Sequence, residues 1–270
     1  MTIGVIISTY NNPEWLAKTL FGYTRQTVSP DEVVIADDGS TDDTRALIDS
    51  YRDRLPIKHV WHEDRGFQKS EILNKAIKTA TADYLIFTDQ DCVPRADFVA
   101  VHKAFAREGR YLSGGYLKLS RPVSDSLTDS DIASGRAFSA EWLLRQGQPF
   151  SFKMRKLICG KPWDTIMNHI TPRAATFNGC NSSCWRKDAE AVNGFNELMH
   201  YGGQDREFGL RLKNSGVRPT QIAYSAIVVH LDHSRPYKTK ETIEANRRIM
   251  EETIRTCRKW TEMGIKHPDE

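Results

Sequence analysis

The sequence predicts an α/β fold in which helices flank a mostly parallel, Rossmann-like sheet. Two observations support this prediction. Strand-like and helix-like segments alternate through the first hundred residues, and strands that are separated by helices pair in parallel through right-handed crossovers. Acidic and polar residues also cluster directly after these strands, and the carboxyl ends of parallel strands meet at one ligand-binding crevice.

The elements of this first half follow from residue patterns. Each strand-like segment is a short apolar or β-branched run, and each helix-like segment carries apolar residues at helical spacing. Asn12 and Pro13 suit the start of the first helix, and Ser40 can cap the second. The predicted strands are 3–8, 32–36, 57–61 and 84–88, and the predicted helices are 13–24, 40–51 and 69–79.

After Gly114 the alternation weakens. Residues 120–175 are rich in Ser, Asp, Pro and Arg and carry scattered aromatic residues. Because linkers rarely contain so many aromatic side chains, we interpret this stretch as a substrate-facing insertion. The elements predicted beyond it are a strand over 222–231 and helices over 188–192, 205–214 and 239–262.

The last of these helices forms a charged C-terminal tail. Its cations lie beside an apolar stripe that includes Ile243 and Met250. Such a helix can lie on an anionic membrane surface, although packing against the domain is the more common case. The basic residues are Lys238, Lys240, Arg247, Arg248, Arg255, Arg258 and Lys259.

The composition excludes several classes of protein. The 270 residues are 39% hydrophobic and 27% charged, which is typical of a globular chain rather than a disordered or membrane-spanning one. The formal net charge of +3 is too small to indicate nucleic-acid binding. Five cysteines without CxxC spacing argue against a disulfide framework or a structural zinc site. The start of the chain lacks the pattern of a secretory leader, so we expect a cytoplasmic protein.

The sharpest chemical signal is the sequence Asp89-Gln90-Asp91, which follows the strand predicted over 84–88. Two carboxylates one residue apart can hold one hard divalent cation and leave coordination places for phosphate oxygens. A bound Mg²⁺ or Mn²⁺ would stabilise the charge of a departing nucleotide diphosphate. The pattern also fits a pair of solvated turn acids, but acids that follow a buried strand seldom lack a partner.

Four segments of the first half occur together in a characteristic order: 6–11 (IISTYN), 34–42 (VIADDGSTD), 73–76 (LNKA) and 86–91 (IFTDQD). In this order and spacing they resemble the nucleotide-sugar half of the family 2 inverting glycosyltransferases, which have the GT-A fold. The resemblance therefore narrows the expected architecture from a Rossmann-like sheet to the GT-A fold, to which the residue pattern adds a C-terminal helical tail.

The second half carries a further resemblance. Segments 177–181, 192–196 and 202–212 resemble the acceptor side of galactosyltransferase-like and chondroitin-polymerase-like members. Together the two resemblances cover residues 3–233, apart from the insertion. They imply a nucleotide-sugar-binding half over 1–115 and an acceptor-binding half over 116–235, and the helical tail over 236–270 lies outside them.

The resemblance implies which residues bind the nucleoside. Thr9, Tyr10 and Asn11 would line the base and the ribose, and Asp38, with Asp37 beside it, would accept a hydrogen bond from the pyrimidine ring. Because a carboxylate suits the N–H of uracil, a UDP-sugar is the expected donor. The two aspartates also suit a turn and a helix cap without any ligand.

The resemblance also implies how the diphosphate is held. Arg65 or Lys69 would neutralise its charge, although each is also an ordinary solvated cation in the alternative interpretation. Asp91 would be the principal metal ligand. Asp89 would contact the metal or the ribose, and Gln90 between them would belong to the same nucleotide-sugar site.

A histidine usually completes the metal site in this family. His230, at the end of a predicted strand and 25 residues after Asp205, fits that position, and His233 is its rival. A neutral imidazole is a chemically suitable partner for a carboxylate at a Mn²⁺ or Mg²⁺ site.

Asp205 is the candidate base because it matches the second acid of the family's Gly-Gly-Glu-Asp segment. Inverting transfer needs a carboxylate close to the attacking hydroxyl. Gln204 replaces the first acid, which places any inherited acceptor preference in doubt. Gly202 and Gly203 would let the acceptor approach the backbone, and Trp163 would stack on a sugar face or pack in the core.

These residues predict a metal-dependent inverting glycosyltransferase that moves a sugar from a UDP-sugar to a hydroxyl of a glycan or glycolipid acceptor. We expect a role in bacterial surface polysaccharide or lipopolysaccharide synthesis, with peripheral association at the inner face of the cytoplasmic membrane. One alternative is a sugar nucleotidyltransferase, but residues 8–12 (STYNN) are not its Gly-rich basic loop. The other is a degenerate nucleotide-sugar-binding or glycan-binding protein, against which the intact acids argue.

Overall fold

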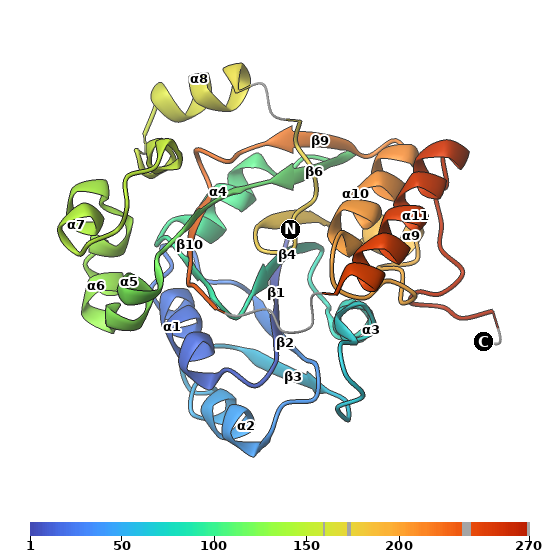
Figure 1. Cartoon of the computed structure of the whole chain (residues 1–270), viewed down its shortest axis with the longest axis horizontal. Helices are drawn as coiled ribbons and strands as arrows, with labels where there is room; N and C mark the ends of the chain where they lie inside the picture. The colour runs from blue at the N-terminus through green and yellow to red at the C-terminus, as the bar shows by residue number, and fades with distance from the viewer. Residues whose placement is uncertain (159, 172–173, 234–238, 269–270) are drawn as a thin grey trace.

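A seven-stranded sheet forms the centre of the chain in a computed structural model that describes residues 1–158, 160–171, 174–233 and 239–268 (Figure 1). The strand order is β3-β2-β1-β4-β8-β6-β9, and only β8 runs antiparallel to its neighbours among the described strands of this sheet. The predicted α/β architecture with a mostly parallel sheet is confirmed. The strands are β1 (Ile3–Thr9), β2 (Glu32–Asp37), β3 (Ile57–Trp61), β4 (Tyr84–Asp89), β6 (Arg110–Ser113), β8 (Ser182–Trp185) and β9 (Arg218–Gln221).

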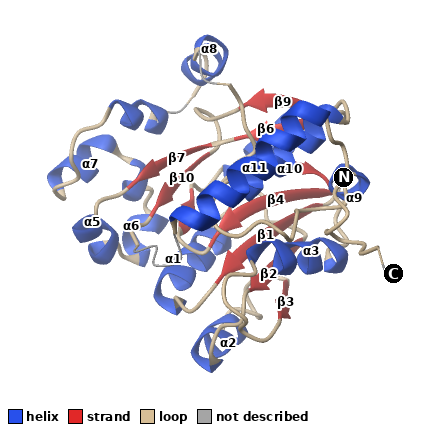
Figure 2. Cartoon of the chain, turned by 45° about the vertical axis from the view of Figure 1, so that its right-hand side comes forward, coloured by secondary structure: helices blue, strands red, loops and turns tan. Residues whose placement is uncertain are grey.

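Helices cover both faces of this sheet (Figure 2). Apolar residues alternate along β1 and β2, so that one face packs against α1, α2 and α4 and the other against α3, α9 and α10. The last helix, α11, packs on the outside of α10. The helices are α1 (Pro13–Thr24), α2 (Asp42–Asp49), α3 (Lys69–Thr79), α4 (Phe98–Phe105), α9 (Arg186–Ala191), α10 (Gln204–Asn214) and α11 (Lys240–Thr256).

A second, three-stranded sheet stands beside the first and consists of β5 (Cys92–Pro94), β10 (Ile227–His230) and β7 (Gly115–Lys118). Its register places His230 opposite Cys92, and the amide of Leu231 donates a hydrogen bond to the carbonyl oxygen of Asp91 at 2.8 Å. This pairing brings the end of β10 to the turn that follows β4.

The insertion over 120–175 consists of short helices that cover the small sheet with an apolar cluster of their own. It projects from one side of the molecule, away from the C-terminal helix (Figure 1). Its elements are α5 (Arg121–Ser126), α6 (Asp129–Ala133), the 3₁₀ helix η1 (Arg136–Phe138), α7 (Ala140–Arg145), the 3₁₀ helix η2 (Phe152–Leu157) and α8 (Trp163–Ile170).

The structure corrects three predicted elements. The strand predicted over 222–231 is shortened to β10, because Asn168 hydrogen-bonds the Tyr224 amide and the Ser225 hydroxyl and holds a turn between β9 and β10. The second helix begins at Asp42 rather than Ser40, whose hydroxyl accepts from the Asn11 amide instead. The tail helix ends at Thr256, because Cys257 takes a left-handed conformation with φ of 50°.

Two expectations about covalent and membrane structure can be compared with the described residues. Cys92, Cys180, Cys184 and Cys257 are all free thiols, as expected, and Cys159 lies outside the described residues. Within the described part of the chain, no helix combines the length and the apolar character needed to cross a bilayer.

Candidate active site

One cavity of about 1310 Å³ opens at the carboxyl ends of β1 and β4. Residues from both halves of the chain line it, so strand ends that are distant in sequence converge as predicted. Asp91 and Asp205 open onto this same space. The predicted site residues that line it are Thr9, Tyr10, Asn11, Asp38, Lys69, Asp89, Gln90, Asp91, Gly202, Gly203, Gln204, Asp205 and His230.

The ends of β1 and β4 are tied together by side-chain hydrogen bonds. The parallel register sets Ser8 opposite Asp89, so the residues that follow each strand lie side by side. The Gln90 amide group accepts from the Thr9 hydroxyl at 2.5 Å and from the Tyr10 amide at 3.1 Å, and it donates to the Tyr10 carbonyl at 3.1 Å. Gln90 therefore fixes the first loop of the cavity.

Lys69 places a cation among the carboxylates. Its Nζ donates to Asp89 Oδ1 at 2.5 Å, and the same oxygen accepts from the Ser8 hydroxyl at 2.7 Å. Burial by itself would lower the pKa of Lys69, but the charges of Asp89, Asp205 and Asp91 raise it above its ordinary value. The ammonium is therefore charged at neutral pH and directed into the cavity.

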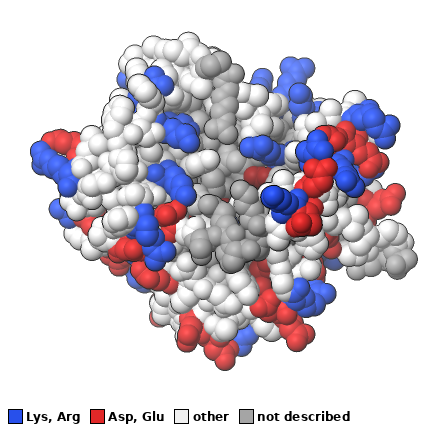
Figure 3. Space-filling view, in the orientation of Figure 1, with Lys and Arg blue, Asp and Glu red and all other residues white. Residues whose placement is uncertain are grey.

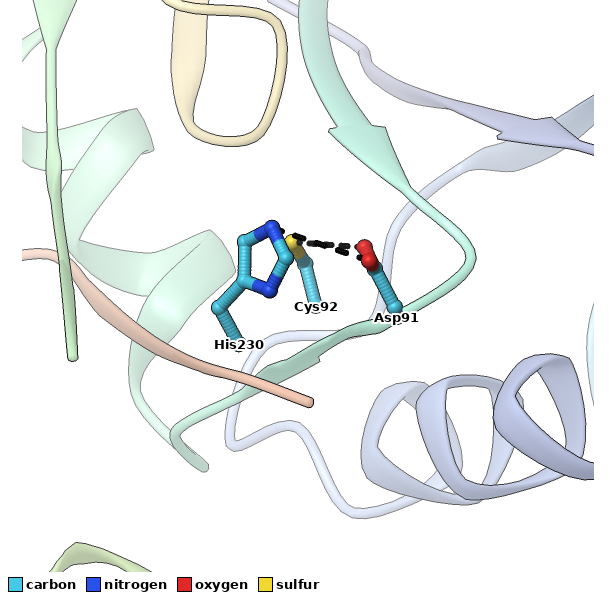
Figure 4. Close-up of side chains that lie close together, drawn as sticks. All are labelled: Asp91, Cys92 and His230. Carbon is cyan, nitrogen blue, oxygen red and sulfur yellow. Dashed lines mark hydrogen bonds and ion pairs between the residues drawn. The ribbon is translucent and has the colours of Figure 1, made fainter. Parts of the chain in front are cut away.

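Asp91 lies with two histidines and one cysteine at the point where the two sheets meet. Its Oδ2 is 2.8 Å from His233 Nε2 and 3.6 Å from His230 Nε2, and its Oδ1 accepts from the Cys92 thiol at 3.3 Å. Figure 4 shows that Asp91, Cys92 and His230 point toward one another, Asp91 from the turn before β5, Cys92 from the start of β5 and His230 from β10. The rival histidine, His233, is thus the nearer of the two.

In this cluster the Asp91 carboxylate lies among the ring nitrogens of two histidines. Burial would raise the pKa of Asp91, but the two histidines and the thiol hold it below its ordinary value, so the carboxylate is ionised. Burial raises the pKa of the Cys92 thiol, which acts as a neutral donor to Asp91. Asp89, in contrast, turns toward Lys69 and is absent from this group.

Asp205 lies in the first turn of α10, one residue after its start. Its Oδ2 accepts from the Gly179 amide at 2.9 Å, and its Oδ1 accepts from the Arg206 amide at 2.9 Å. Burial raises the pKa of Asp205, with a contribution from the Asp89 charge, while these hydrogen bonds and the Lys69 cation oppose that rise. The carboxylate is thereby a stronger base than an ordinary aspartate.

The two adjacent aspartates after β2 have different surroundings. Asp38 lines the cavity, where its Oδ1 is 2.8 Å from His62 Nε2 and its Oδ2 accepts from the Gln68 amide at 3.0 Å. Burial raises the pKa of Asp38, and His62 opposes this rise. Asp37 does not line the cavity; it is buried against His59 at 2.8 Å and accepts from the Ser40 amide at 2.9 Å.

Two further predicted site residues lie away from the cavity lining. Arg65 is exposed, and its Nη2 donates to both carboxylate oxygens of Glu71 at 2.7 and 2.8 Å. Trp163, at the start of α8, packs against Met167 and Tyr224. Neither residue lines the cavity in the described part of the chain, so Lys69 is the better placed of the two candidate cations.

Comparison with known protein families gives two matches. The model described as "Glycosyl transferase family 2" matches residues 4–132, which include both strand ends that carry Thr9 and Asp91. Residues 4–132 belong to glycosyl transferase family 2. A second model, described as "N-terminal domain of galactosyltransferase", matches residues 166–234, which include Asp205 and His230.

Curated relatives agree with the first match. Validoxylamine A glucosyltransferase of Streptomyces hygroscopicus subsp. limoneus is 31% identical over 87% of the chain and 53% of its own length. Chondroitin synthase of Pasteurella multocida is 26% identical over 79% of the chain and 23% of its own length. The chain therefore spans about half the length of the former relative and about a quarter of the latter.

Solved structures confirm the GT-A fold. S. aureus TarS 1-349 in complex with UDP superposes with a TM-score of 0.65 at 18% identity, over 93% of the chain and 64% of that protein. The mannosyltransferase PcManGT from Pyrobaculum calidifontis, in complex with GDP-Man and Mn²⁺, gives 0.58 at 21% identity, over 87% and 58%. At these identities the likeness concerns the fold.

The tail helix contributes to the cavity in a way the sequence did not indicate. Ile243, Arg247 and Met250 of α11 line it, although they lie beyond both matched segments. Asn246 is buried and donates to the carbonyl oxygens of His200 at 2.8 Å and Gly202 at 2.9 Å. The tail thus packs on the domain, as in the commoner alternative; Lys238 lies outside the described residues.

Other residues of the site were also missed. His62, Cys92 and Gly179 contact predicted acids, and only Gly179 lay within a segment that carried the resemblance. A pairing such as Cys92 with His230 depends on the register of β5 and β10, which a single sequence does not reveal. The Gln204 side chain accepts from the Gly202 amide at 3.0 Å, so this departure from the family segment supports the turn before Asp205.

Proposed function

We propose that this chain is an inverting glycosyltransferase that moves a sugar from a UDP-sugar to the hydroxyl of a glycan or glycolipid acceptor. The observation that carries the proposal is the shared cavity of Asp91 and Asp205. One acid stands with histidines and suits a cation; the other stands with backbone amides at the start of α10 and suits a proton acceptor. The donor half is residues 1–115, the acceptor half 116–235 and the tail 236–270.

The donor side supports UDP. Asp38 opens onto the cavity beside the loop that carries Thr9 and Tyr10, and its carboxylate can accept from the N–H of uracil. Among solved relatives in fold, TarS binds UDP and UDP-GlcNAc, whereas PcManGT binds GDP-Man with Mn²⁺. Lys69 is placed to neutralise diphosphate charge.

The residues around Asp91 fit a divalent cation. An ionised carboxylate and two imidazole nitrogens form a donor set that suits Mn²⁺, and Mg²⁺ less closely. Asp91 with His233 and His230 would hold the ion. When bound, such an ion stabilises the negative charge that develops on the departing diphosphate.

The remaining steps belong to the side chains of the chain itself. Asp205 Oδ accepts the proton of the acceptor hydroxyl as that oxygen attacks the sugar carbon from the side opposite the diphosphate. The raised pKa of Asp205 makes this transfer more favourable at neutral pH. Lys69, which bonds Asp89 and lies near Asp205, keeps the two carboxylates from repelling each other.

The acceptor is proposed only as a class. The relatives include glycan synthases such as chondroitin synthase, and TarS of Staphylococcus aureus is named a poly(ribitol-phosphate) β-N-acetylglucosaminyltransferase. These names support a growing bacterial surface glycan or lipopolysaccharide as acceptor. Gly202 and Gly203 line the cavity and, with φ of 111° and 95°, hold the turn before α10 in a conformation that favours glycine.

The test separates binding from chemistry. The protein is incubated with UDP-sugars and Mn²⁺, and UDP binding is followed by thermal shift and UDP release by a coupled assay. We expect Mn²⁺-dependent UDP binding in the wild type and in Asp205→Asn, and its loss in Asp91→Asn. Absence of metal-dependent binding and of release with every common donor would refute the proposed function.

A further inference from the structure

A basic, acid-free stretch lies in the insertion between Trp142 and Trp163. It contains five Lys and Arg residues and neither Asp nor Glu. Taking these five from the 38 basic residues of the chain leaves 33 against 35 acidic residues, so the remainder of the chain carries a net negative charge. The overall charge of +3 conceals this segregation.

The same stretch exposes apolar side chains. Phe150 is 70% exposed and Phe152 is 72% exposed, and their rings meet edge to face at 5.6 Å between centroids. Two aromatic rings in contact with each other and with water are unfavourable on a surface that only faces solvent. Further exposed aliphatic side chains of the insertion are Leu144, Ile158, Ile166 and Ile170.

The cations lie directly beside these rings. η2 begins at Phe152 and continues with Lys153, Arg155 and Lys156, and the Arg155 guanidinium lies 5.7 Å from the centre of the Phe152 ring. In the orientation of Figure 1, the charged side chains visible over η2 are mostly Lys and Arg (Figure 3). Lys153 and Lys156 also line the cavity, so this surface continues into the candidate active site.

We propose that the segment from Leu144 to Ile158 docks the chain onto an anionic membrane surface. Phe150 and Phe152 insert at the level of the headgroups, and Lys153, Arg155 and Lys156 contact anionic lipid. A single-stranded nucleic acid would also use aromatic and basic residues, but it gives no reason for the exposed Leu144 and Ile158. The proposal assigns membrane contact to the insertion rather than to α11.

The position of this surface also indicates the class of acceptor, an inference that rests on the proposed function. A membrane that lies against η2 brings lipid-linked molecules to the edge of the cavity, where Lys153 and Lys156 stand. The acceptor class that this geometry favours is therefore a membrane-anchored glycan. Membrane binding itself does not depend on catalysis and is measured without a donor.

The experiment is vesicle flotation of the full chain. We expect it to bind vesicles of phosphatidylcholine with about 30% phosphatidylglycerol at least tenfold more tightly than pure phosphatidylcholine, and less tightly as salt rises. The double variant Phe150→Ser, Phe152→Ser should lose about tenfold or more of that affinity. The matched control is Ile254→Ser, which removes a 58% exposed apolar side chain from α11 and should change nothing.

Three outcomes would overturn the proposal: no binding to anionic vesicles, binding that the double Phe variant retains, or loss of binding in Ile254→Ser alone. A different result would replace membrane docking with a nucleic-acid surface: no vesicle binding, together with tight binding of single-stranded RNA that the Phe variant abolishes. Mn²⁺-dependent UDP binding, measured on the same preparations, is expected to be unchanged in the Phe variant. Its absence in every preparation would contradict the proposed function and leave membrane docking standing.

Discussion

The two walls of the cavity are built by different means. The donor wall, which we define as Ser8–Asn12, Asp38, Lys69 and Asp89–Asp91, consists of strand ends in a parallel sheet with side chains hydrogen-bonded to one another across the strands. The acceptor wall, which we define as residues 201–206 together with α11, consists of a glycine turn and two helices.

The acceptor wall depends on buried polar contacts instead of strand register. Arg211 and Glu207 form a fully buried ion pair at 2.9 Å on α10. Thr253 of α11 donates to Glu207 at 3.0 Å, and Arg211 donates to the carbonyl oxygens of Val192 and Gly194. Strand register therefore orders most of the donor wall, to which α3 adds Lys69, whereas the acceptor wall exists only once the tail has packed.

Asp205→Asn should separate the walls most strongly. Because the amide cannot take the acceptor proton, we expect transfer to fall by about 10²- to 10⁴-fold. UDP binding by the donor wall should be unchanged within a factor of about two, since Asp205 lies outside it. Initial rates measure the loss of transfer, and thermal shift with UDP and Mn²⁺ measures the unchanged binding. Transfer at the wild-type rate would remove Asp205 from the role of base.

Arg211→Met should weaken the acceptor wall through the fold. It leaves Glu207 buried without its partner, and we expect a loss of about 3–5 kcal/mol in the free energy of unfolding. Urea unfolding measures this loss. The matched control is Arg206→Met, an exposed neighbour on the same helix, which should stay within about 0.5 kcal/mol of wild type. Equal stability of the two variants would show that the buried pair does not hold this wall.

Asn246→Ala should affect the acceptor wall alone. The change removes two hydrogen bonds to the turn before α10 and should cost about 1–3 kcal/mol of stability. We expect a higher KM for the acceptor with an unchanged Kd for UDP. Acceptor saturation curves measure the KM, and UDP titrations measure the Kd. A change in UDP affinity of the same size would contradict the separation of the walls.

The smallest effect concerns pH and links the walls through Lys69. Because the pKa of Asp205 is raised and the base must be ionised, transfer should fall with decreasing pH already above the ordinary range of aspartate. Lys69→Met removes a cation that opposes this rise, so the acid limb should move to higher pH. The pH–rate profiles of the two proteins check this order. If the acid limb of the Lys69→Met profile stayed in place or moved to lower pH, it would contradict the expected effect of Lys69 on Asp205.

The sequence allowed most of the donor wall to be predicted, because β-branched runs and the polar residues after them follow directly from the chain order of a parallel sheet. Asp91 was correctly placed after a strand and Asp89 forms the last residue of that strand, but their separate surroundings were not foreseen. Lys69 reaches Asp89 from a helix, and His233 reaches Asp91 from beyond β10. Both contacts are long-range.

The acceptor wall and the insertion were harder to predict for a physical reason. Asp205 was found through its motif, whereas the contribution of α11 depends on Asn246 meeting a distant turn. Trp163 was expected at the site but packs against Met167 and Tyr224, since its ring is also suited to a core. Short helices such as α5 and α6 lack the long apolar period that identifies an element.

The most direct measurement is a crystal structure of the chain grown with UDP and Mn²⁺, in which anomalous scattering locates the manganese. We predict a manganese peak beside Asp91 and the histidines that follow β10, with the diphosphate toward Lys69 and the Asp205 carboxylate facing the vacant sugar side. A peak held by other acids, or a nucleotide bound where Asp205 cannot reach the sugar, would contradict the account.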